Sequence, residues 1–205
     1  MSGAAVERIE RRREHGGRSH ERDLHLEHAV VEVGEQEEEH ERQRGGHPAG
    51  RRPPGPPVGE PAPDFELEGT GGRFKLSDHR GERVVLLFYP GDNTPVCTRQ
   101  FCSYRDNAEA FDALDATVVG ISSQSVDSHE SFTAEHGLNV PLLADADGDV
   151  AKAYGAHQPV VGTKRAAIIV DEEGVVRYRH DHLLGLDFQS VDDLREALDE
   201  LPARA

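Results

Sequence analysis

The feature that most constrains the fold is a run of residues with high β propensity, Arg83 to Tyr89, with the sequence RVVLLFY. The run lacks the alternation of apolar and polar residues that marks a strand with one face in water, so it predicts a strand buried on both faces. Such a strand needs a covering layer on each side. The chain is therefore restricted to architectures in which helices pack on both faces of a sheet.

Strand and helix patterns alternate around this run. We expect further strands at Thr117–Ser123, Val140–Ala144, Ala166–Val170 and Val175–Arg179, and helices at Pro95–Leu114, Val126–His136, Asp149–Tyr154 and Val191–Leu201. Pro95 suits the first turn of a helix, and Gly137 and Gly155 suit helix ends. Ser190 is the expected N-cap of the last helix. This order of elements predicts an α/β fold with a central mixed sheet flanked by helices.

Residues 1–57 differ in composition from residues 58–205. They contain 10 Arg, 12 Asp plus Glu and six of the 12 His, but no Lys, Phe, Tyr or Cys, and they end in RRPPGPP. Because apolar residues are too sparse there to form a core, we predict a disordered extension with a proline-rich linker over 1–57 and one folded domain over 58–205. The histidines of the extension do not have the spacing of a closed metal site. The composition also fits a leader sequence upstream of the true start codon.

The charge balance excludes several classes of protein. The chain carries 23 Lys plus Arg against 39 Asp plus Glu, a net charge of −16. This excludes a nucleic-acid footprint of the usual basic kind and disfavours binding to anionic lipid. No apolar run approaches the roughly 18–20 residues that span a bilayer, and the N-terminus has no apolar signal-peptide core. We therefore expect a cytoplasmic protein whose two cysteines meet reducing surroundings, where a catalytic role is more common than a structural one.

Cys97 stands where the loop after the buried strand opens the next helix. The sequence from Tyr89 to Cys102 is YPGDNTPVCTRQFC, so Cys97 falls in the first helical turn and Thr94 precedes it by three residues. Free backbone N–H groups and the positive end of the helix dipole favour a thiolate at such a position. The alternative is a small buried apolar residue, which is the usual role of a lone cysteine.

Cys102 lies five residues further along the same predicted helix. This separation corresponds to a rise of about 7.5 Å and puts the two Cα atoms about 8–9 Å apart, whereas a disulfide requires less than about 7 Å. The pair can bridge only if the first turns of the helix unwind, which disfavours a structural disulfide and leaves a reversible one open. A zinc half-site is the alternative, but C-x4-C is wider than the usual knuckle and the chain has no second cysteine pair.

These residues resemble the signature of the peroxiredoxins. The motif P-x-x-x-[TS]-x-x-C of that family occurs here as Pro90, Thr94 and Cys97. The C-x4-C spacing is similar to that of the bacterioferritin-comigratory-protein, or Q-type, branch, although Gln100 stands where this branch often has Glu. Residues 58–65, 75–78 and 162–165 resemble other segments of the family. The resemblance therefore extends from about residue 58 to residue 201.

The resemblance implies a thioredoxin-like fold and a thiol peroxidase that reduces hydrogen peroxide and organic hydroperoxides. In this family Cys97 would attack the peroxide and become a sulfenic acid, and Cys102 would resolve it as an intramolecular disulfide. Thr94 would hydrogen-bond the thiolate and the peroxide, Pro90 would shield the site from water, and Arg165 would stabilise the thiolate. A thioredoxin- or glutaredoxin-like donor would reduce the disulfide. The resemblance further implies a monomer or weak dimer that needs no metal, haem or flavin.

Two other functions remain open from the sequence. A peroxide sensor or thiol-oxidising relay would use the same cysteine pair with a protein as the final acceptor. A holdase or interaction module would not depend on Cys97. A general thioredoxin-type reductase is disfavoured because the chain has no C-x-x-C motif.

Two acidic or histidine-containing clusters resemble metal sites. Residues 145–149 (DADGD) resemble a calcium loop, but Ala156 stands at the twelfth position, where such a loop has Glu. We expect a turn before a capped helix there. His180, Asp181 and His182 could clip a metal ion, but we interpret them as a solvated strand end.

Overall fold

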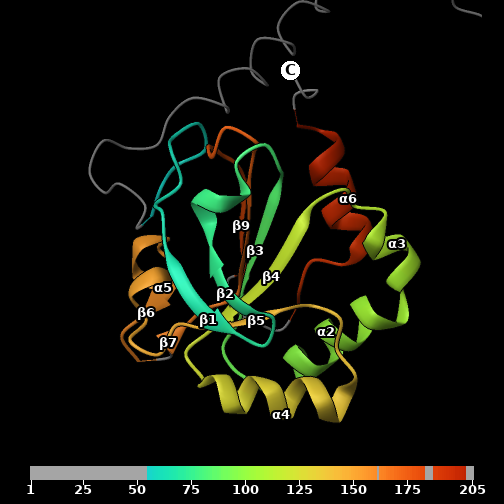
Figure 1. Ribbon diagram of the computed structural model, residues 1–205. Helices are drawn as coiled ribbons and strands as arrows, with labels where there is room; N and C mark the ends of the chain where they lie inside the picture. The colour runs from blue at the N-terminus through green and yellow to red at the C-terminus, as the bar shows by residue number, and fades with distance from the viewer. Residues whose placement is uncertain (1–54, 161, 183–186, 202–205) are drawn as a thin grey trace, which may run out of the picture. The chain divides into compact units, whose positions relative to one another are not determined.

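The structure is a computed structural model and describes residues 55–160, 162–182 and 187–201. Its centre is a seven-stranded mixed sheet with the strand order β2-β1-β5-β4-β3-β8-β9, and β6 and β7 form a separate two-stranded sheet (Figure 1). The strands are β1 (Glu66–Gly69), β2 (Gly72–Lys75), β3 (Val84–Phe88), β4 (Thr117–Ser122), β5 (Leu142–Ala144), β6 (His157–Gln158), β7 (Gly162–Thr163), β8 (Ala166–Val170) and β9 (Val176–Asp181). The helices are the 3-10 helix η1 (Leu76–His79) and the α-helices α2 (Pro95–Asp106), α3 (Ala108–Asp112), α4 (Val126–His136), α5 (Asp149–Ala153) and α6 (Val191–Asp199).

The central strand β3 is buried on both faces, as its unbroken apolar sequence predicts. It pairs in parallel with β4 and antiparallel with β8. Because side chains alternate along a strand, Val85 and Leu87 enter one core cluster while Val84, Leu86 and Phe88 enter the other. The sheet therefore separates two apolar layers, and each layer needs its own cover.

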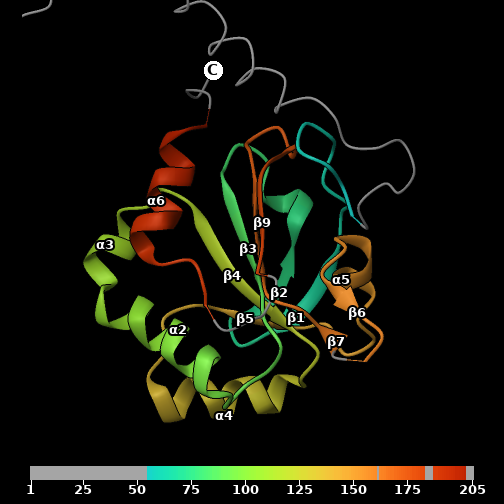
Figure 2. The same ribbon diagram turned by 180° about the vertical axis from the view of Figure 1, so that it is seen from behind.

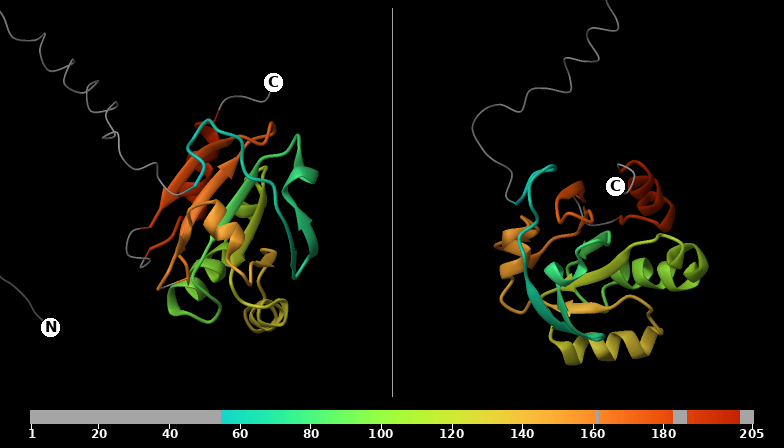
Figure 3. Two further views of the ribbon diagram at one scale, coloured as in Figure 1. Left: turned by 90° about the vertical axis from the view of Figure 1, so that its left-hand side faces the viewer. Right: turned by 45° about the horizontal axis from the view of Figure 1, so that its top comes forward.

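Helices cover both faces of the sheet, which confirms the predicted architecture (Figure 2). The core cluster on one face draws its side chains from α2, α3, α4 and α6 together with β3, β4 and β8. The cluster on the other face contains residues of α5, of η1 and of the segment that precedes β1. Figure 3 shows α5 and α6 on opposite sides of the sheet. Both cysteines lie in α2, which belongs to the first layer.

Several helix boundaries follow the local signals in the sequence. The helix α4 ends at Gly137, which has the left-handed φ of 61° expected of a helix C-cap. The helix α6 begins with a capping box in which Ser190 and Asp193 bond to each other's backbone N–H groups. The turn before α5 is held by the buried carboxylate of Asp145, which accepts from the N–H groups of Val150 at 3.2 Å and Ala151 at 2.8 Å. These three predictions are confirmed.

Other expectations were wrong. The single helix predicted for Pro95–Leu114 is two helices, α2 and α3, because Asn107 interrupts it with φ −113° and bonds its side chain Nδ2 back to the carbonyl oxygen of Ser103 at 2.8 Å. No strands were predicted for the β1–β2 hairpin. The solvated interpretation of the 180–182 segment holds for His180 but fails for His182, which is 7% exposed with Nδ1 2.9 Å from Asp187.

Gly120 of β4 allows α2 to pack closely against the sheet. A Cβ atom at this position would lie 3.0 Å from the ring of Phe101 in α2 and 2.7 Å from Leu142 in β5. Both distances are shorter than ordinary van der Waals contact, so a larger residue would force the side chains of Phe101 and Leu142 to shift. The position of the cysteine-bearing helix thus depends on a glycine in the neighbouring strand.

Most of the predicted N-terminal extension lies outside the described residues. Gly55, Pro56 and Pro57, which were assigned to its linker, are described and half-buried, and the carbonyl oxygen of Pro57 accepts from the N–H of Glu60 at 3.2 Å. Within the described ranges, no helix has the length and apolarity needed to cross a bilayer.

Candidate active site

Thr94 fixes the start of α2 and with it the position of Cys97. It is the N-cap residue, with extended φ and ψ, and Pro95 occupies the first helical position. The Thr94 hydroxyl accepts a hydrogen bond from the N–H of Cys97 at 3.4 Å and donates one to the carbonyl oxygen of Gly91 at 3.3 Å. Cys97 is therefore held in the first turn, as the sequence predicted, and its side chain is buried.

Arg165 reaches the same place from a distant part of the chain. It directly precedes β8, and the register of β8 against β3 pairs Ala166 with Phe88. This pairing brings Arg165 to the end of β3 from which the loop to Cys97 departs. The guanidinium Nη2 donates to the Cys97 sulfur at 3.1 Å, and the Arg165 residue is only 2% exposed.

Gln100 and Tyr104 orient the Arg165 guanidinium. Both project from α2 and are buried. The Gln100 Oε1 accepts from the Arg165 Nη1, and its Nε2 donates to the Tyr104 hydroxyl at 3.0 Å. Burial raises the pKa of Tyr104, so the hydroxyl stays protonated and donates to the carbonyl oxygen of Gln189 at 2.5 Å. The side chain that supports Arg165 is therefore a neutral amide, which leaves the guanidinium charge directed at the sulfur.

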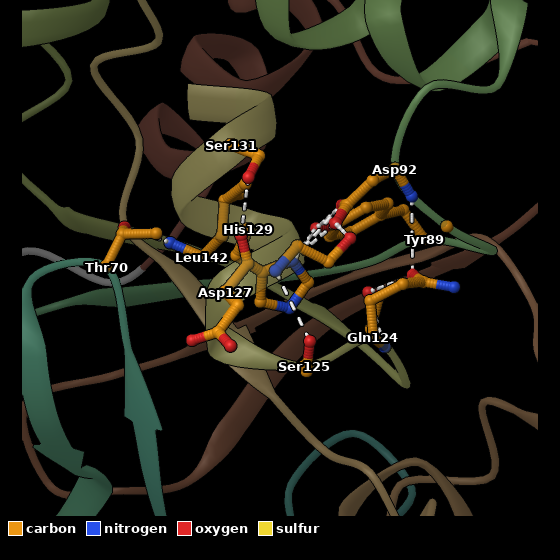
Figure 4. Close-up of polar contacts among 12 residues, drawn as sticks. Thr70, Tyr89, Asp92, Gln124, Ser125, Asp127, His129, Ser131 and Leu142 are labelled. Atoms are coloured by element: carbon orange, nitrogen blue, oxygen red, sulfur yellow. Dashed lines mark hydrogen bonds and ion pairs between the residues drawn. The ribbon is translucent and has the colours of Figure 1, made fainter. Parts of the chain in front are cut away.

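The loop between β3 and α2 is held by a second buried network. The Tyr89 hydroxyl donates to Asp92 at 2.8 Å, and Asp92 also lies 2.9 Å from the Nδ1 of His129 in α4 (Figure 4). The sequence analysis did not identify this network. His129 and Phe132 are spaced by three residues on the buried face of α4, so a histidine within the apolar stripe of that helix was the available signal.

The two remaining predicted residues lie nearby in the chain. Cys102 is half-buried in α2, and both cysteines are free thiols within one unbroken helix. Pro90 is half-buried in the loop that leads from β3 to Thr94. The structure thus places Thr94 against the backbone N–H of Cys97, Arg165 against its sulfur, and Cys102 further along α2.

Among residues 55–160, 162–182 and 187–201, no three His, Cys, Asp or Glu side chains gather as they would to hold a metal ion. The chemical resources of the site are a buried sulfur, a guanidinium in contact with it and a second thiol on the same helix.

Comparisons with known proteins show the family to which the chain is similar. The AhpC/TSA family matches residues 58–179. Peroxiredoxin Bcp from Bacillus subtilis is 38% identical over 125 residues, which are 57% of this chain and 80% of that protein.

Solved structures share the fold. The crystal structure of peroxidoxin BcpB from Mycobacterium tuberculosis matches with a TM-score of 0.63 and 29% identity, over 72% of this chain and 99% of that chain. A structure of the Xanthomonas campestris bacterioferritin comigratory protein, described for its alkyl peroxide reduction activity, matches with a TM-score of 0.58 and 28% identity, over 66% and 90% of the two chains. The thioredoxin-like arrangement implied by the sequence resemblance is confirmed. The chain therefore belongs to the AhpC/TSA family as a peroxiredoxin of the bacterioferritin-comigratory-protein, or Q-type, branch, which makes it a peroxidase among the oxidoreductases.

Proposed function

We propose that the protein reduces hydroperoxides with Cys97 as the attacking thiolate and Cys102 as the resolving thiol. The observation that carries the proposal is the 3.1 Å contact between the Arg165 guanidinium and the Cys97 sulfur in a buried site. A hydrogen bond from a permanently charged donor favours a thiolate over a thiol, and low solvent exposure strengthens the hydrogen bond itself. The position of Cys97 in the first turn of α2 acts in the same direction.

In the first step, the Cys97 thiolate attacks one oxygen of the peroxide. The O–O bond breaks, the sulfur becomes a sulfenic acid, and the departing alkoxide or hydroxide takes a proton from water. The same guanidinium that stabilises the thiolate can donate to the oxygen that gains negative charge. Thr94 holds the sulfur in place for this attack through the N–H of Cys97.

In the second step, the Cys102 thiol attacks the sulfenic acid, releasing water and forming a disulfide. Five residues of α-helix correspond to a rise of about 7.5 Å, so an intact α2 holds the two Cα atoms beyond the roughly 7 Å limit of a disulfide. The first turns of α2 must therefore unwind between the two steps. We further propose that a thioredoxin- or glutaredoxin-like dithiol in the cytoplasm reduces the disulfide by exchange, with the protein working as a monomer or weak dimer.

Hydrogen peroxide and small organic hydroperoxides are the proposed substrates. Both are neutral and are not repelled by a chain with a net charge of −16. The reported alkyl peroxide reduction by the Xanthomonas campestris relative supports the inclusion of organic hydroperoxides.

Paired variants test the two cysteine roles. Cys97→Ser should abolish peroxide consumption in the presence of a thioredoxin system. Cys102→Ser should consume one equivalent of peroxide and then stall or become over-oxidised. Normal turnover by Cys102→Ser would show that another thiol resolves Cys97, and activity in Cys97→Ser would refute the proposal. A wild-type protein that forms the disulfide but turns over only with another protein as acceptor would act as a relay instead.

A further inference from the structure

Asp92 ties the active-site loop to α4, a helix that carries neither cysteine. Its side chain is only 3% exposed and lies five residues before Cys97. One carboxylate oxygen accepts from the Tyr89 hydroxyl at 2.8 Å, and the other accepts from the Ser128 hydroxyl at 2.7 Å. The second oxygen also lies 2.9 Å from the Nδ1 of His129 (Figure 4). The loop is thus bonded to the first turns of α4 through its buried carboxylate.

The protons of this network can be assigned from its acceptors. The His129 Nε2 lies 3.2 Å from the carbonyl oxygen of Leu143 in β5, and a carbonyl oxygen can only accept, so the Nε2 carries a proton. Burial raises the pKa of Asp92, but the hydrogen bonds from His129, Ser128 and Tyr89 outweigh it and lower that pKa below its usual value. The carboxyl group is therefore ionised, and it lies within hydrogen-bond distance of the His129 Nδ1. His129 and Asp92 form a buried pair, with His129 fully buried and the Asp92 side chain 3% exposed.

The backbone of the loop also requires support from outside. Asn93 adopts a φ of 57°, in the left-handed region that residues other than glycine rarely occupy. The N–H of Asp92 is bonded to the Oε1 of Gln124 at 3.3 Å, and the hydroxyl of Ser122 holds that same oxygen at 2.7 Å. Asparagine adopts this region more readily than most residues, and contacts from neighbouring structure hold the loop in it. The contacts from Asp92 supply that support immediately before Thr94.

We infer that Asp92 and His129 form a positioning pair for Cys97. The pair fixes the loop, the loop places Thr94, and Thr94 caps the helical turn in which Cys97 meets Arg165. Neither Asp92 nor His129 touches the sulfur, so their effect on its reactivity passes through the loop. This inference rests on the proposed role of Cys97 as the attacking thiol.

Two variants at one position separate hydrogen bonding from packing. In Asp92→Asn, the amide oxygen can accept from Tyr89, and the amide N–H groups can donate to Ser128 and to the Nδ1 of a neutral His129, so every bond of the network has a replacement. In Asp92→Ala, none of these side-chain hydrogen bonds has a replacement. Tyr154→Phe is the matched control, because it removes a buried 2.7 Å hydrogen bond to the carbonyl oxygen of Pro63 on the other face of the sheet.

The readouts are the rates at which Cys97 reacts with hydrogen peroxide and with iodoacetamide, each as a function of pH. Trypsin cleaves after Arg99, between the two cysteines, so mass spectrometry follows Cys97 separately from Cys102. We expect Asp92→Ala to slow both reactions by about tenfold or more, since small misplacements of a reacting group have effects of this size or larger. Asp92→Asn should recover most of the rate, and Tyr154→Phe should leave it unchanged. Circular dichroism identifies the temperatures at which all variants remain folded.

The inference fails if folded Asp92→Ala reacts with both reagents at rates within about twofold of the wild type, a difference too small for a positioning role. If Asp92→Ala does not fold, His129→Leu removes the pair from the α4 side. Slowing by about tenfold or more then supports the inference, and rates within about twofold of the wild type refute it. Iodoacetamide needs no peroxide chemistry. A wild-type Cys97 that is alkylated readily but inert to peroxide would therefore refute the proposed function while leaving the effect of the pair measurable.

Discussion

Replacement of Arg165 by Gln removes the only charge in contact with the Cys97 sulfur among the residues described. The donor–sulfur distance is 3.1 Å and both residues are buried. At that distance a unit charge pair interacts by on the order of 5 kcal/mol at an effective dielectric constant of about 20. The cost of keeping both charges out of water offsets much of this. Hydrogen bonds to charged groups in proteins contribute about 1.5–3 kcal/mol net, and we take this range for the thiolate.

This range of hydrogen-bond free energies predicts a range of reaction rates. Since about 1.4 kcal/mol corresponds to a factor of ten, Arg165→Gln should slow the reaction of Cys97 with peroxide at pH 7 by roughly 10- to 150-fold. Alkylation of Cys97 by iodoacetamide at pH 7 should slow as well, because it also depends on the reactivity of the same sulfur. Quenched samples digested with trypsin give both rates from the same peptide.

Arg177→Gln provides the control, because it removes another partly buried guanidinium. Arg177 pairs with Asp171 near the start of β9, whereas Arg165 lies beside the end of that strand. It should lower stability without altering the reaction of Cys97. If Arg165→Gln is folded and Cys97 reacts within about twofold of the wild-type rate at every pH, the guanidinium does not supply the stabilisation expected of a charged hydrogen bond. The electrostatic argument for the site would then be wrong.

Three further changes probe the fold and the support of the site. Burial raises the pKa of the Asp171 carboxyl group, but hydrogen bonds from backbone N–H groups and a guanidinium outweigh it and hold that pKa below its usual value. The stability that this lowered pKa gives is present above about pH 4 and is lost as the pH falls through the folded-state pKa. Urea unfolding should therefore show the wild type losing its stability advantage over Asp171→Asn below about pH 4. Gly120→Ala places a methyl group against Phe101 and should destabilise the fold by about 1–3 kcal/mol, measured by the same unfolding method. Tyr104→Phe leaves buried hydrogen-bonding groups without a partner, which should cost about 1–3 kcal/mol and slow Cys97, whereas an unchanged rate would show that Arg165 needs no support from this side.

The elements that could be predicted from the sequence are those with strong local signals. The unbroken apolar run of β3, the glycine at the end of α4 and the serine before α6 each specify a local conformation with little dependence on the rest of the fold. The β1–β2 hairpin carries no comparable signal. Its strands lie at one end of the sheet order and are only four residues long, and Glu66 and Glu68 pair across the hairpin with Arg73 on exposed surface. Charged, short strands of this kind give a weak β pattern.

The same limit applies to the candidate site. Cys97 and Thr94 could be placed from the sequence because a helix start is a local structure. Arg165 is 68 residues from Cys97, and only the pairing of β8 with β3 brings the two together. Without the resemblance to the peroxiredoxins, Arg165 would have been interpreted as a surface ion-pair residue. The contact of His129 with Asp92 is likewise created by tertiary packing, since the two residues lie on different elements and 37 positions apart.

The most direct test of the proposed chemistry is to add one equivalent of hydrogen peroxide to the fully reduced protein, quench within seconds and map both cysteines by mass spectrometry. Trypsin cleavage after Arg99 should then give two peptides joined by a disulfide between Cys97 and Cys102. The same peptides should separate again after addition of a thioredoxin system. Recovery of both cysteines as free thiols would contradict the proposed peroxidase chemistry, and oxidation of Cys97 with Cys102 left free would contradict its resolving step.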